Sequence, residues 1–274
     1  MSSFIFYKFY FSMFFKSRIL KYIAFLLLVV ILILLYLSVN VLILTHSSTV
    51  SFIVSQVEKV ERERLAYFLW SMPFIEIIVF ISIFITSYIV SGDFESKESE
   101  VLYTLPISRE KIYISKILAA FSWSAIFAGI YFISEATILT LIFNAPPLIL
   151  SIESFLLSLI GVFSIVSLTS FFSITMKNPL RSSLTTILIY FVAMNILNFY
   201  FLIEGIGQPL YLLNSDISII SEVYTQVNIL PIGAIGSISG APLNLIINSI
   251  FGMLSYIIAF FIFSLIASHY GDIK

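Results

Sequence analysis

Long apolar runs separated by short polar segments dominate this chain. Six runs contain about 20 residues or more, the length that an α-helix needs to cross about 30 Å of hydrocarbon. The first run is too long for the hydrophobic region of a cleaved signal peptide, which spans about 7–15 residues. The pattern predicts an all-α integral membrane protein whose residues 1–274 form one domain. Its expected transmembrane helices cover residues 22–44, 67–90, 117–143, 155–176, 184–203 and 243–267.

The composition excludes a water-soluble domain. Hydrophobic residues make up 60% of the chain and charged residues only 11%, whereas soluble domains average about 25% charged residues. The absence of cysteine excludes disulfides, thiolate metal sites and cysteine nucleophiles. A formal net charge of −1 gives no reason to expect nucleic acid as a partner.

Lysine and arginine are distributed unequally between the two sides of the predicted bundle. Three cations, Lys59, Arg62 and Arg64, precede the second span, and the other eleven belong to the opposite side. Because cations accumulate in cytoplasmic loops, the pattern predicts a multi-pass protein of the cell membrane with both termini in the cytoplasm. The eleven cations are Lys8, Lys16, Arg18, Lys21, Lys97, Arg109, Lys111, Lys116, Lys177, Arg181 and Lys274.

Two further segments have patterns of their own. In residues 1–21, Lys8, Ser12 and Lys16 recur every four positions among aromatic residues, which predicts an amphipathic interfacial helix. A disordered basic tail is the alternative for this segment. Residues 204–242 are apolar, contain no cation and are rich in glycine. We expect them to form an outer re-entrant segment of short broken helices packed against the bundle.

The charged segment between the second and third spans, residues 91–116, reads SGDFESKESEVLYTLPISREKIYISK. Its acidic side chains suit the start of a short helix, because the helix dipole favours negative charge there. Pro106 ends that helix, and Ser108 is a suitable N-cap for the next one, with Glu110 in its first turn. We therefore expect a cytoplasmic helix–turn–helix element that docks on a soluble partner. The acids are Asp93, Glu95, Glu98 and Glu100.

This segment resembles the loop after the second span of ABC type-2 permeases, the membrane subunits of exporter-like ABC transporters. Their pattern has the form E-x-E-x-G-T-L-E-L-L-L-x-x-P-[IV]-S-R, followed seven residues later by a lysine. The present chain departs from the pattern at Lys97 and Glu98, in place of Gly-Thr, and at Tyr103, in place of leucine. The matching positions are Asp93, Glu95, Glu100, Leu102, Pro106, Ile107, Ser108, Arg109 and Lys116.

The resemblance implies that the loop is a coupling helix seated in a groove of a separate cytoplasmic ABC ATPase subunit. It also implies a second permease subunit and the export of an unknown substrate. ATP and magnesium would bind the ATPase, and this chain, which has no G-x-x-x-x-G-K-[ST] motif, would be neither an enzyme nor the holder of a cofactor. The expected ATPase contacts are Glu95, Glu100, Leu102, Pro106 and Arg109.

Two acidic residues within the predicted spans are the remaining candidates for chemistry. Glu76 and Glu135 are both expected about 12–14 Å below the outer ends of their spans. Carboxyl groups at such depth are costly and usually face a cavity or a partner. They either line a substrate path or form structural hydrogen bonds. Two alternative functions use them, a proton-coupled secondary transporter and, less favoured, an intramembrane hydrolase. The sequence contains no metal-binding or nucleophile motif, so we expect no catalytic or metal site.

Overall fold

The structure, a computed structural model, describes residues 3–45, 59–95, 108–143, 149–204, 211–224 and 241–270. Every regular element in these ranges is helical, and six helices are long and apolar enough to cross a membrane. The prediction of an all-α chain with six candidate transmembrane helices is confirmed. These candidate spans are Arg18–Leu37, Tyr67–Phe94, Arg109–Leu141, Ile149–Met176, Pro179–Phe201 and Leu243–Ser268.

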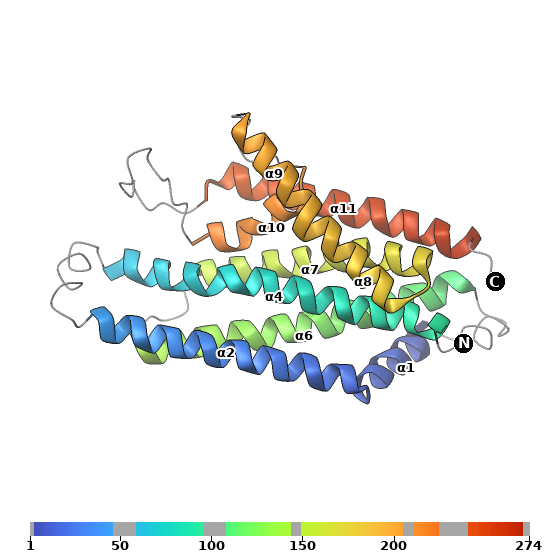
Figure 1. The fold of residues 1–274 in the computed structure, drawn as a ribbon, viewed down its shortest axis with the longest axis horizontal. Coiled ribbons are helices and arrows are strands. Elements are labelled where there is room, and N and C mark those ends of the chain that lie inside the picture. Colours follow the sequence, from blue (N-terminus) through green and yellow to red (C-terminus); the bar gives the residue numbers. More distant parts are fainter. Residues whose placement is uncertain are drawn as a thin grey trace.

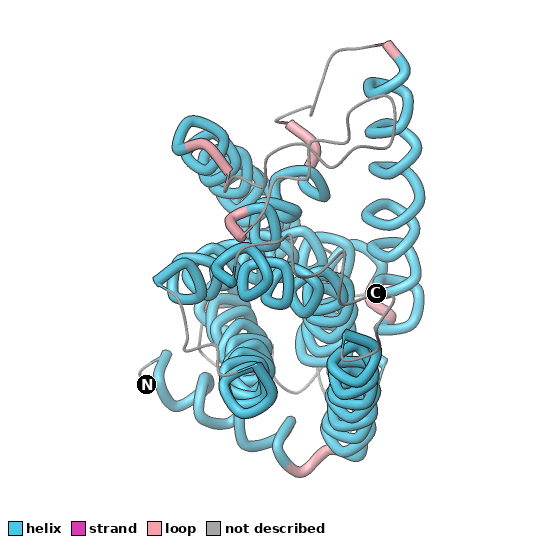
Figure 2. Tube along the Cα trace, turned by 90° about the vertical axis from the view of Figure 1, so that its left-hand side faces the viewer, coloured by secondary structure: helices cyan, strands magenta, loops and turns pink. Residues whose placement is uncertain are grey.

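The long helices run roughly along one another in a bundle (Figure 1). The described helices are α1 (Ser3–Phe15), α2 (Arg18–Thr45), α4 (Lys59–Glu95), α6 (Arg109–Phe143), α7 (Ile149–Met176), α8 (Pro179–Ile187), α9 (Met194–Ile203), α10 (Leu213–Glu222) and α11 (Leu243–Tyr270). A π-helical turn, Leu188–Ala193, joins α8 to α9 without a break. Most of the helices appear nearly end-on when the bundle is viewed along its length (Figure 2).

Helix α1 and the end of α11 lie at the same end of the bundle, where α4 ends and α6 and α8 begin (Figure 1). We call this the loop end, because the chain leaves α4 and enters α6 there. The opposite end contains the end of α9 and the beginning of α11 (Figure 1).

The centre of the bundle is formed by α4, α6 and α7, and α11 packs along α7. Serine lines much of the buried face of α7, and the hydroxyls of Ser164, Ser167 and Ser173 donate to carbonyl oxygens of that helix. Small side chains whose polar atoms are already satisfied allow neighbouring helices to approach closely in a membrane. Between helices, the hydroxyls of Tyr113 and Ser170 lie 2.8 Å apart and connect α6 to α7.

Helix α1 packs against α6 through a regular aromatic stripe. Phe6, Tyr10 and Phe14, spaced four residues apart, are buried. The polar stripe predicted from the sequence, which includes Lys8 and Lys16, is exposed on the opposite face. Within residues 1–21, the structure shows a helix over Ser3–Phe15, and Arg18 begins the next helix. One stripe of the broad aromatic surface of α1 is covered by protein.

Helix α8 has clear sequence signals at its start. Asn178 Oδ1 accepts a hydrogen bond from the Arg181 backbone N–H at 3.0 Å, and Pro179 occupies the first turn. An N-cap amide and an early proline are both favourable at this position. Lys177, with a φ of 53°, makes the turn from α7. Local sequence signals therefore define where this span begins.

The segment of residues 204–242 contains one described helix, α10. It packs against α4, α7 and α11. Asn214 Nδ2 donates to Asn195 Oδ1 at 3.0 Å and so joins α10 to α9. Residues 205–210 and 225–240, which complete the predicted re-entrant segment, lie outside the described residues.

Candidate functional site

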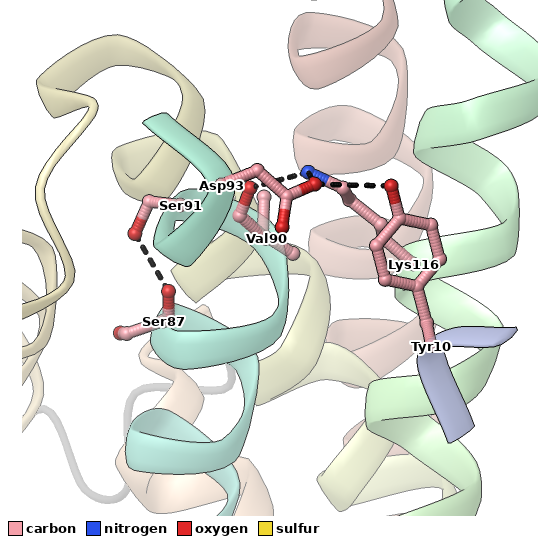
Figure 3. Close-up of polar contacts among 6 residues, drawn as sticks. All are labelled: Tyr10, Ser87, Val90, Ser91, Asp93 and Lys116. Atoms are coloured by element: carbon pink, nitrogen blue, oxygen red, sulfur yellow. Dashed lines mark hydrogen bonds and ion pairs between the residues drawn. The ribbon is translucent and has the colours of Figure 1, made fainter. Parts of the chain in front are cut away.

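A buried ion pair connects the end of α4 to the first turns of α6. Lys116 Nζ lies 2.8 Å from Asp93 Oδ2, and these side chains are 4% and 3% exposed, respectively. Lys116 Nζ also donates a hydrogen bond to the Val90 carbonyl oxygen at 3.0 Å. In Figure 3 the lysine reaches from α6 to the last turns of α4. The two helices that flank residues 96–107 are therefore tied together at the point where they enter that connection.

Helix α1 completes this cluster. The Tyr10 hydroxyl donates to Asp93 Oδ2 at 3.0 Å (Figure 3). Lys116 Nζ lies 5.2 Å from the Tyr10 ring centroid and 5.5 Å from that of Phe94, within the range of cation–π attraction. We call Tyr10, Asp93 and Lys116 the loop clamp. It joins three helices that are far apart in the sequence.

The polar contacts of the loop clamp offset the cost of burying its charges. Removing a carboxylate and an ammonium group from water is repaid only when their geometry is good and further hydrogen bonds satisfy them. Here Asp93 accepts from a lysine and a tyrosine, and Lys116 donates to a carboxylate and a carbonyl. The arrangement holds the base of the connecting segment in one geometry. It contains no group positioned as a nucleophile or general base.

The loop clamp corrects two expectations about residues 91–116. Asp93 and Glu95 do not begin a new helix, because α4 continues through Glu95 as its final residue. Lys116 directly precedes the span expected at residues 117–143, yet its side chain is buried within the bundle. The ion pair explains both differences, since the lysine offsets the unfavourable acidic charge in the last turn of α4.

Two of the predicted ATPase contacts, Glu95 and Arg109, belong to the described helices. Glu95 is the last residue of α4. Arg109 is the first residue of α6, directly after Ser108 and before Glu110 in the first turn, as predicted. Glu100, Leu102 and Pro106 lie outside the described residues.

Glu76 and Glu135 occupy different surroundings. Glu76 is exposed and lies near the π-helical turn, close enough to Tyr190 to interact with it electrostatically. Glu135 is 1% exposed, and neither of its carboxyl oxygens has a hydrogen-bond partner among the described residues. Its side chain lies near those of Tyr131 and Tyr224.

The two glutamates lie on different helices at the centre of the bundle, Glu76 on α4 and Glu135 on α6. Aromatic contacts join these helices between the two acids, where the Phe74 ring lies 4.8 Å from the rings of Tyr131 and Phe132. The Tyr131 hydroxyl also donates to the Trp70 carbonyl oxygen at 2.6 Å. Within the described ranges, no hydrogen bond joins the two carboxyl groups.

A third buried acid, Asp216 on α10, escaped the sequence analysis. Its side chain is fully buried against Gly252 of α11, and its oxygens have no hydrogen-bond partner within the described part of the chain. Burial raises the pKa of the Asp216 carboxyl to about 7. The available signal was the helical spacing of Leu213, Ile217 and Ile220, with Asp216 on the same face. The sequence analysis expected short broken helices in this segment but did not single out this acid.

Metal binding finds no support in the described ranges, where no group of three or more His, Asp or Glu side chains could hold an ion.

Compared with models of protein families and with curated protein sequences, the chain matches none. The fold itself indicates the class to which the chain belongs, a multi-pass helical membrane protein with six candidate spans.

Proposed function

We propose that this chain is the permease subunit of an ABC transporter and exports a substrate across the cell membrane. A separate cytoplasmic ABC ATPase subunit would dock on the segment between α4 and α6. The observation that carries the proposal is the loop clamp. It joins Asp93 and Lys116, the first acid and the final lysine of the pattern that resembles ABC type-2 permeases.

The clamp offers a physical route from ATP hydrolysis to the membrane. Both helices that flank the segment are long enough to span the bilayer, and the clamp ties them together at its base. A force applied to residues 96–107 by an ATPase would therefore act on α4 and α6 together, and on α1 through Tyr10. ATP and magnesium would bind the partner, because this chain has no P-loop motif.

A second permease subunit would complete the transporter. Helix α9 offers a suitable apolar surface, since Ile196, Phe199 and Ile203 are each more than 60% exposed. Interfaces between spanning helices depend on such packing and on small or polar side chains. The loop end, to which the sequence pattern assigns eleven of the 14 cations, would face the cytoplasm.

The proposal is tested by purifying the tagged chain in mild detergent and identifying the proteins that accompany it by mass spectrometry. We expect a stoichiometric ATPase with a P-loop and ATP hydrolysis in the eluate. Glu100→Lys and Arg109→Glu should each release the ATPase, whereas Lys8→Glu, at an exposed position on α1, should retain it. A well-folded preparation without ATPase, or normal association of both loop variants, contradicts the proposal.

A second candidate, a proton-coupled secondary transporter, is favoured by Glu135. A buried carboxyl without a hydrogen-bond partner in the described ranges is a group that proton carriers use. The chain reconstituted alone into vesicles would then conduct protons down an imposed gradient, as reported by a trapped pH-sensitive dye. Glu135→Gln would abolish this flux, and Glu76→Gln is the matched comparison on α4. Absence of any flux in the unmodified chain excludes this candidate.

A further inference from the structure

An apolar groove runs along the outside of α4 near the loop end. It has a volume of about 660 Å³ and is walled by α2, α4 and α8. This volume falls within the range of about 300–1,000 Å³ typical of sites for small molecules. The α4 wall extends from Ile77 to Tyr88. At 1.5 Å per residue this wall is about 16 Å long, which matches one leaflet of a hydrocarbon core about 30 Å thick.

The two ends of the groove differ in polarity. The deeper end is lined by Ile77, Phe80 and Ile81, and the hydroxyl-bearing side chains all belong to the end nearest the loop. Ser87 is 1% exposed, and its hydroxyl has no hydrogen-bond partner within the described ranges. The other hydroxyl groups at this end belong to Tyr22, Tyr88 and Ser183. The groove is thus apolar at one end and polar at the other, as an amphiphilic molecule is. The buried Ser87 hydroxyl, which has no hydrogen-bond partner in the described ranges, lies at its polar end.

Two of the three helices that wall the groove carry cations in their first turns, at the level of its polar end. Arg18 and Lys21 belong to the first turn of α2, next to the lining residues Ile19 and Tyr22. Arg181 belongs to the first turn of α8, after Leu180. All three cationic side chains are exposed. An anionic headgroup placed between α2 and α8 would be attracted from both sides.

We propose that this groove binds one anionic phospholipid from the leaflet at the loop end. An acyl chain lies along α4 between Ile77 and Phe84, and the phosphate lies at the level of Ser87, between Arg18 and Arg181. A second copy of the chain fits this surface less well, because a symmetric contact through the groove brings the same cations together.

The test titrates the purified chain in detergent with phosphatidylglycerol and, separately, with phosphatidylcholine of identical acyl chains, and counts bound lipids by native mass spectrometry. We expect one phosphatidylglycerol bound in preference to phosphatidylcholine. Arg18→Gln combined with Arg181→Gln should weaken phosphatidylglycerol binding about fivefold for each cation removed, or roughly 30-fold together. The matched control, Lys8→Gln with Lys111→Gln, removes two exposed cations that do not belong to the groove walls and should leave binding unchanged.

A second pair of variants tests the groove independently of charge. Ile23→Trp fills the space between α2 and α4 and should abolish selective binding. Leu32→Trp adds the same side chain to an exposed position of α2 that does not line the groove, and should have no effect. Equal binding of the two lipids overturns the proposal, as does equal weakening by the two charge pairs. Recovery of a lipid-free dimer cross-linked through Ile23→Cys also overturns it and assigns the groove to a second copy.

Discussion

A single lysine accounts for much of the order at the loop end. Lys116 is surrounded by a carboxylate, a backbone carbonyl and two aromatic rings, and each of these groups comes from α1 or α4 rather than from its own helix. A charge so enclosed has no access to water if one partner is lost. The contribution of each of these residues to the stability of the chain therefore depends on whether its partner is present.

Replacing one member of the ion pair should destabilise the chain strongly. We expect Asp93→Asn or Lys116→Met to lower the free energy of unfolding by about 3–5 kcal/mol, because each leaves a buried charge unpaired. The double variant should lose clearly less than the sum of the two. Denaturant unfolding in mixed micelles measures all four proteins. Lys111→Met, at an exposed site on the same helix, is the control, and strictly additive losses would contradict the pairing.

Asp216 should make stability depend on pH. Its pKa rises from 3.8 to about 7 on folding because the carboxyl is buried. Between these values the folded chain binds more protons than the unfolded chain, so stability falls as pH rises from about 4 to about 7. The slope is at most about 1.4 kcal/mol per pH unit, and it vanishes above pH 7. Thermal unfolding across this range should lose that slope in Asp216→Asn, and an unchanged slope would contradict the assignment.

At the scale of elements, α10 depends on two close approaches by its neighbours. Gly161 of α7 lies against Ile217 and Ile220, and Gly252 of α11 lies against Asp216. A Cβ at Gly161 would meet those isoleucines at ordinary contact distances of 3.5 Å, whereas one at Gly252 would overlap the carboxyl group. The absence of a side chain at Gly252 is therefore what allows Asp216 to face α11.

Alanine substitution separates these effects. Gly252→Ala should cost about 1–3 kcal/mol of stability, because the buried carboxyl must move. In an Asp216→Ala background the cost should disappear. Gly129→Ala on α6, where an added Cβ meets nothing within 4 Å, should stabilise by up to about 1 kcal/mol through helix propensity. Unfolding free energies in detergent give all three values. Equal changes in the free energy of unfolding for Gly252→Ala and Gly129→Ala would contradict the contact between Gly252 and Asp216.

Elements with long apolar runs were predictable from the sequence, and those defined by tertiary contacts were not. Each of the six expected spans corresponds to a candidate span of the structure, because about 20 apolar residues suffice to specify one. The pairing of Asp93 with Lys116 depends on how α4 and α6 pack, and no local pattern encodes it. The helix α10, of ten residues, fits the expected short broken helices, but its bounds and its buried Asp216 could not be read from so short a segment. The π-helical turn at Leu188–Ala193 has no proline or glycine to mark it.

At the scale of the whole molecule, the six spans and the unequal distribution of cations predict which end faces the cytoplasm. The chain contains no cysteine, so single cysteines can be introduced without competition. Ser108 lies at the loop end, and Ile149, which is 78% exposed, begins α7 at the other end. A membrane-impermeant maleimide on intact cells should label Ile149→Cys. It should label Ser108→Cys only after the cells are permeabilised, and the reverse pattern would contradict the orientation.

The packing of α1 against α6 has a consequence for the order in which the helices of the chain pack together. Trp123 donates its indole N–H to the Phe11 carbonyl oxygen, across 112 residues of sequence. At synthesis rates of about 5–20 residues per second, Trp123 is synthesised roughly 5–20 seconds after α1. Helix α1 therefore leaves the ribosome well before the helix against which it packs. A chain truncated before residue 123 would lack this contact and would leave part of the aromatic stripe of α1 uncovered.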